Sequence, residues 1–103
     1  MHADLAQAAR DAIDAQGGPC TYQCGNVTAS ITAVIRQGVQ IENEIGQATR
    51  VNTVRAMVQD TANLKKGATF QDLESGITYG YMTTLLDNGI TRLMQVSVMN
   101  AEV

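Results

Sequence analysis

Residues 77–98 read ITYGYMTTLLDNGITRLMQVSV, two runs rich in β-branched and aromatic residues on either side of Asp87-Asn88-Gly89. An Asn-Gly pair between such runs is the strongest short-range hairpin signal, because a type I′ turn needs positive φ at both central residues. The spacing places Ile77, Tyr79 and Tyr81 on one face of the first strand. A two-stranded hairpin is marginal alone, so the remainder of the chain must supply partner strands.

The best alternation in the chain begins at Val27 and predicts a half-buried strand of about ten residues. Residues 20–24 predict a short strand before it, with Gly25-Asn26 as the tight turn of an antiparallel pair. Residues 49–59 and 68–73 have strand character as well. We therefore predict a mainly β fold, a small antiparallel β-sandwich or barrel of about six strands over residues 19–99, in a single domain spanning 1–103.

The N-terminal segment, residues 3–16, predicts one α-helix. Its apolar residues follow the spacing of a single helical stripe, and they are Leu5, Ala8, Ala9, Ala12 and Ile13. Gly17-Gly18 is expected to end the helix in a left-handed conformation before Pro19. The stripe is narrow and rich in alanine, which suits close packing on a sheet or on a neighbouring subunit.

Residues 38–48 interrupt the strand pattern and predict either a long loop or a projecting hairpin. The segment mixes Val39, Ile41 and Ile45 with Glu42 and Glu44. Loops of this length in small domains are usually functional or disordered. Two interpretations stay open, a solvated loop and an interaction loop. For the second, the candidate interface residues are Val39, Ile41, Glu42, Glu44 and Ile45, with Leu5 and Ala9 of the helix.

The predicted core consists of apolar residues that fall on one face of their strands. They are Ile31, Ala33, Val54, Val58, Phe70, Tyr79, Val96 and Val98. Aromatic residues are scarce, with one Phe, three Tyr and no Trp, so aliphatic side chains must fill most of the interior.

Charge and composition argue against two classes of partner. The net charge is −3 and the basic residues are scattered, which disfavours a phosphate-neutralising grip on nucleic acid. No apolar run approaches the roughly 18 residues needed to span a bilayer, so no membrane partner is expected. The N-terminus has no basic-then-apolar signal pattern, and an intracellular location is the default expectation.

Residues that could carry catalysis or bind metal are few. His2 is the only histidine, so an imidazole-based triad is not expected. Cys20 and Cys24 would lie about 13 Å apart on one strand at roughly 3.3 Å per residue, too far for a disulfide. With no second pair they do not make a zinc site. We predict no enzyme activity, no catalytic residue, no cofactor and no metal site.

The order of these pieces resembles the small head–tail joining proteins of tailed bacteriophages, also called head-completion or stopper proteins, which include the lambda-type joining protein. The resemblance covers about 80 residues of turns and strand alternations. It rests on the N-terminal helix, the strand at 19–22, VTASITAV at 27–34, LKKGATF at 64–70, GITY at 76–79 and Asn88-Gly89. Ala68 stands where family members often carry Asp after the glycine.

The resemblance implies a virion protein that forms a homo-oligomeric ring in the phage neck, assembled in the host cytoplasm. The ring would join the portal or adaptor of the DNA-filled head to the tail, and DNA would pass through its lumen without specific binding. Tail-terminator and tail-tube proteins of the same virions are similar too. The rival from another class is a small monomeric β-barrel binding module.

Overall fold

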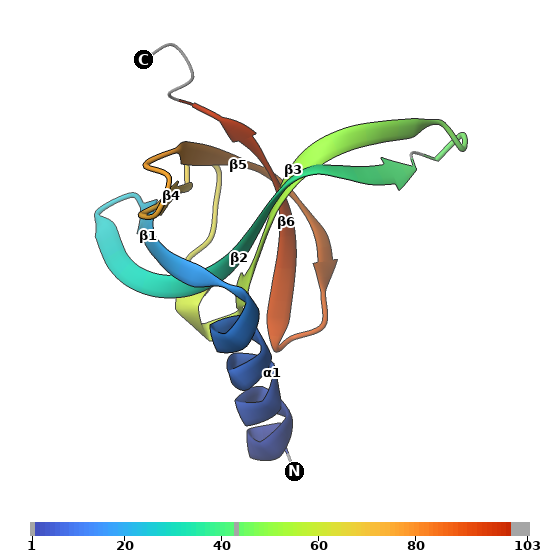
Figure 1. The fold of residues 1–103 in the computed structure, drawn as a ribbon. Helices are drawn as coiled ribbons and strands as arrows, with labels where there is room; N and C mark the ends of the chain where they lie inside the picture. The colour runs from blue at the N-terminus through green and yellow to red at the C-terminus, as the bar shows by residue number, and fades with distance from the viewer. Residues whose placement is uncertain (1, 43, 100–103) are drawn as a thin grey trace.

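The computed structural model describes residues 2–42 and 44–99, with side chains from Leu5 onward, and shows six strands and an N-terminal helix. The elements are α1 (His2–Gln16), β1 (Gly18–Cys24), β2 (Val27–Glu42), β3 (Ala48–Met57), the 3₁₀ helix η1 (Gln59–Thr61), β4 (Thr69–Asp72), β5 (Thr78–Asp87) and β6 (Thr91–Val98). The predicted mainly β fold with one helix is confirmed (Figure 1).

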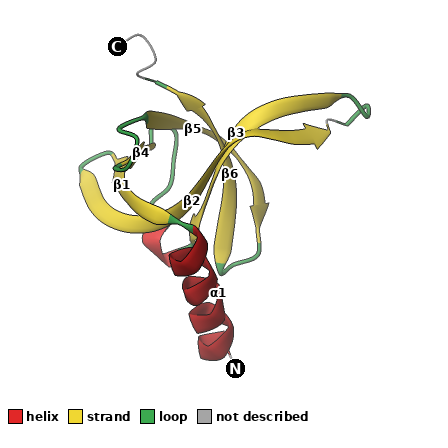
Figure 2. Ribbon diagram, in the orientation of Figure 1, coloured by secondary structure: helices red, strands yellow, loops and turns green. Residues whose placement is uncertain are grey.

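All strand pairs are antiparallel, and the sheet closes on itself in the order β1-β2-β3-β6-β5-β4, with β4 pairing back to β1. Of the two architectures predicted, sandwich and barrel, the structure is the barrel (Figure 2). Closure removes the exposed sheet edges that an open sheet of this size would leave. The predicted β1–β2 hairpin is confirmed, with Cys24 opposite Val27 across the turn.

The β5–β6 hairpin is present, but its predicted type I′ turn is wrong. Gly89 has φ of 85°, whereas no described residue other than glycine has positive φ, so Asn88 does not meet the requirement of that turn. Side chains hold the loop instead. Asn88 Oδ1 accepts hydrogen bonds from the backbone N–H groups of Ile90 and Thr91, and Asp87 Oδ1 accepts one from Gly89. Hydrogen bonds from nearby backbone N–H groups to the Asp87 and Asn88 side chains therefore stabilise this loop in place of a type I′ turn.

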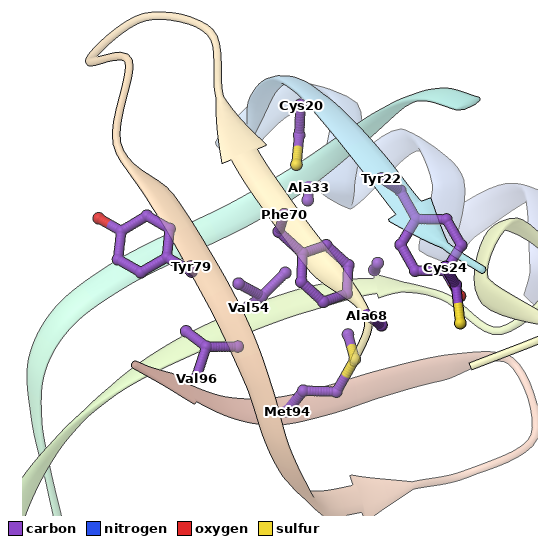
Figure 3. Close-up of a cluster of buried hydrophobic side chains, with 11 residues drawn as sticks. Cys20, Tyr22, Cys24, Ala33, Val54, Ala68, Phe70, Tyr79, Met94 and Val96 are labelled. Atoms are coloured by element: carbon purple, nitrogen blue, oxygen red, sulfur yellow. The ribbon is translucent and has the colours of Figure 1, made fainter. Parts of the chain in front are cut away.

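The barrel interior is filled by one cluster of buried side chains in which Tyr22 and Phe70 pack with ring centroids 5.2 Å apart (Figure 3). Five predicted core residues are buried, namely Ala33, Val54, Phe70, Tyr79 and Val96. Ile31 is half-buried against the cluster. Val58, which follows the end of β3, is half-buried as well. Val98 is 36% exposed at the end of β6, so that prediction was too strong.

A second, smaller cluster holds α1 against the outer wall of the barrel through Ile13, Val34 and Met57. Only the second half of the helix takes part, because Ile13 is buried while Leu5 is 57% exposed. Arg10 of the helix also forms a bidentate ion pair with Asp60, in which Nη1 lies 2.9 Å and Nη2 3.0 Å from the carboxylate oxygens. The first half of the helix projects away from the barrel (Figure 1).

The junction between α1 and β1 depends on Gly17, for a reason other than the one predicted. Neither Gly17 nor Gly18 is among the glycines with positive φ, so the predicted left-handed stop is wrong. A Cβ at Gly17 would lie 2.4 Å from the carbonyl oxygen of Ala33 and 2.9 Å from that of Ile13. The glycine is needed because the helix end meets the β2 backbone closely.

Candidate functional site

The predicted loop at residues 38–48 is the far end of a projecting β-hairpin, one of the two forms that the sequence allowed. β2 pairs with β1 only up to Ala33 and with β3 from Val34 to Glu42. β3 in turn pairs with β6 only from Asn52 onward. Residues 36–42 and 44–51 therefore form a two-stranded arm that leaves the barrel wall (Figure 1).

A β-bulge sets the direction of this arm. Gln37 and Gly38 of β2 oppose the single residue Asn52 of β3, and Gly38 has φ of 66°. The bulge is held by side chains, since Gly38 N–H donates to Asn52 Oδ1 at 3.2 Å and Arg50 Nη1 donates to Gly38 O at 3.0 Å. Bulges of this kind re-aim a strand and increase its twist.

The base of the arm is tied to the barrel interior. Gln37 Nε2 donates to the Tyr79 hydroxyl oxygen at 2.7 Å, and the Tyr79 side chain belongs to the main core cluster. A two-stranded hairpin alone is marginal, so these bonds and the bulge give the arm a defined orientation at its root.

The structure separates the predicted interface residues into three groups. Glu42, Glu44 and Ile45 lie at the arm tip and are exposed, Ile45 by 78%. Val39 and Ile41 are half-buried on the arm. On the helix, Leu5 is exposed, whereas Ala9 packs against the second cluster of its own chain and has an intramolecular role. Position 43 at the tip lies outside the described residues.

Beside the arm, a groove of about 460 Å³ runs along the outer wall of the barrel. Its apolar strand residues come from β2, β5 and β6 and are Val34, Val39, Ile41, Leu85 and Leu93, and Ala12 and Gln16 of α1 also line it. The apolar lining continues along the arm because of the bulge. Its extra residue shifts the alternation of β2, so that Val39 and Ile41 lie on the same face as Val34.

Two arginines, Arg36 and Arg55, also line the groove and are exposed. Within the described part of the chain, neither guanidinium has a hydrogen-bond or ion-pair partner. The contrast is with Arg10 and Arg92, which pair with Asp60 and Asp87. An apolar groove edged by two unpaired cations is suited to an apolar and acidic partner.

In the part of the chain that the structure describes, the barrel interior is filled by the main core cluster. Burial raises the pKa of the Cys20 thiol to about 12, with the Asp72 carboxylate adding to the shift, so this thiol stays protonated at neutral pH and is a poor nucleophile. Burial likewise raises the pKa of Tyr22 to about 12, and its hydroxyl donates to Asn63 Oδ1 at 2.9 Å. Both cysteines are free and buried on β1, as expected from their spacing (Figure 3).

Metal ligands do not gather in the described residues either, where no group of three or more His, Cys, Asp or Glu side chains could hold an ion. The side chain of His2, the only histidine, lies outside the described residues. No described helix is long and apolar enough to cross a membrane.

Comparison with known proteins does not assign the chain. No family model matches it, and no curated protein matches it. The resemblance to phage joining proteins therefore stays a prediction.

Sequence reasoning found the arm but missed the groove. Val39, Ile41 and the tip residues were singled out, whereas Arg36, Arg55, Leu85 and Leu93 were not. One signal was present: Val34 is an apolar residue on the face of β2 that otherwise carries Thr28, Ser30 and Thr32. An apolar break on a polar face indicates that something covers the outside of the sheet there.

Proposed function

We propose that this protein is a structural subunit of a phage neck, which forms a homo-oligomeric ring joining the portal or adaptor of the head to the tail. The observation that carries the proposal is the two-stranded arm with its exposed tip. Over residues 36–42, β2 has β3 as its only strand partner among the described residues. Such strand edges and exposed apolar side chains are the usual means by which β subunits associate.

Charge supports the same proposal. With a net charge of −3, the chain is not suited to holding DNA phosphates, so a genome could slide through a ring built from it. The neck location and the portal, adaptor and tail partners in this proposal rest on the resemblance to the joining proteins in the order of helix, strands and turns. No enzymatic step is part of this proposal.

The groove on the outer wall favours one rival function, a monomeric β-barrel binding module. Light scattering separates the two. A ring requires a mass several-fold above 11.0 kDa and annular particles in negative stain, either for the chain alone or on addition of a phage portal–adaptor complex. A chain that stays monomeric at high concentration and does not assemble on that complex would refute the ring.

The arm is tested by the double variant Ile41→Asp with Ile45→Asp. We expect its melting temperature to stay close to that of the wild type, because Ile45 is exposed and Ile41 only half-buried, while joining of heads to tails is lost. The matched control is Val27→Asp with Leu73→Asp, which adds the same charge at exposed apolar positions away from the arm. An unfolded double variant would instead make the arm part of the core.

A further inference from the structure

The groove and the arm tip have complementary chemistry. The groove presents an apolar floor with Arg36 and Arg55 at its edge. The tip presents Ile45, a large and exposed aliphatic side chain, between the exposed carboxylates Glu42 and Glu44 and the glycine turn at Gly46. An aliphatic anchor flanked by acidic side chains is the kind of partner that such a groove accepts.

The tip of the same chain cannot fill this groove. Val39 and Ile41, which form part of its lining, belong to the arm itself, and Glu42 at the tip pairs with Ala48 of β3. Between Arg36 and Glu42 the strand runs outward for about 20 Å at ~3.3 Å per residue. An extended, paired strand does not fold back on its own face, so an arm tip in the groove must come from a second copy.

We propose that the arm tip of one copy docks in the outer-wall groove of the next, with Ile45 against the apolar floor and Glu42 and Glu44 against Arg36 and Arg55. The two surfaces differ, so the contact is head-to-tail and each subunit uses both, which is the arrangement that builds a ring when the rotation between neighbours closes. This inference rests on the proposed ring and names the surfaces that would build it.

Charge reversal tests the pairing. The groove variant is Arg36→Glu with Arg55→Glu, and the tip variant is Glu42→Arg with Glu44→Arg. Each alone places like charges opposite one another and should weaken self-association by about a hundredfold or more. Combining all four changes in one chain restores opposite charges and should restore association. So should mixing the two variants in equal amounts, because each then supplies the partner that the other lacks.

The readout is mass by sedimentation velocity over a concentration series, at low and at high salt. The control for the groove variant is Lys65→Glu with Lys66→Glu, which makes the same change in net charge on an exposed loop elsewhere and should leave association unchanged. Association of the wild type should weaken as salt rises, since exposed charge pairs are screened.

The outcomes separate this inference from the ring itself. Loss of self-association in each variant, with recovery in the combined variant, supports the docking. If the recovered assemblies are only small head-to-tail oligomers, the docking is supported and the ring is refuted. Wild-type rings that neither variant disturbs overturn the docking and leave the ring standing. A wild-type chain that stays monomeric throughout overturns the docking, and binding of an acidic peptide to that monomer would assign the groove to another protein.

Discussion

Strand β2 contains two regions that differ in strand pairing and in side-chain burial. The first region belongs to the barrel that stabilises the fold, and the second belongs to the arm that is available to a partner. From Val27 to Ala33 the strand pairs with β1, and Ala33 is buried in the barrel. Beyond the bulge at Gly38 it pairs only with β3, and none of its side chains from Val39 to Glu42 is buried. Stability should therefore depend on the first region and association on the second.

The largest effect on stability is expected in the barrel. Phe70 is fully buried and packs on Tyr22, so Phe70→Ala should lower the free energy of unfolding by about 3–5 kcal/mol. The matching change on the arm, Ile45→Ala, should alter it by no more than about 0.5 kcal/mol, because the side chain is exposed. Urea unfolding of both variants measures the contrast, and similar losses would show that the arm is part of the core.

The second expected effect is at the junction of helix and barrel. Gly17→Ala places a methyl group 2.4 Å from the Ala33 carbonyl oxygen, and the backbone atoms there cannot rotate away. We expect a loss of about 1–3 kcal/mol from overpacking. Thermal unfolding measures it, with Ala15→Gly, an exposed helix position, as a control for helix propensity. A stabilised variant would mean that the helix end can move away from β2.

A smaller effect is expected at the β5–β6 loop. Gly89→Val forces a β-branched residue into the left-handed region and should cost about 1–2 kcal/mol, with nothing within 4 Å to add a clash. Ser97→Val, an exposed position on β6, is the control in the same hairpin. If both variants melt at the wild-type temperature, the loop does not need positive φ at Gly89.

The smallest effect is a pH dependence in the same loop. The backbone N–H of Gly89, and then Arg92, hold the pKa of Asp87 below its ordinary value. A lowered folded-state pKa contributes stability above the unfolded pKa, near 4, and this stability is lost as pH falls through the folded value. The gap in urea midpoint between the wild type and Asp87→Asn should therefore narrow from pH 7 to pH 3. A constant gap would contradict the role of the Asp87 charge.

The sequence determined the elements of this fold because their signals are local. Alternation from Val27, the stripe ending at Ile13 and the turn residues near Asn88 each act within a few positions, and they correctly predicted one helix and a set of antiparallel strands. Local signals also marked Val39, Ile41 and Ile45 as unusual in a long connection. They did not specify the turn at Asn88, where side-chain hydrogen bonds competed with backbone geometry.

Only the tertiary structure decided the closure of the barrel and the groove on its outer wall. Closure depends on β1 meeting β4, which no local pattern encodes. The groove unites Val34, Arg55, Leu85 and Leu93 from four strands with the end of α1, and it continues along the arm only because a bulge keeps Val39 on the same face. A surface built from residues distant in sequence emerges from pairing and register, which are long-range properties of the folded chain.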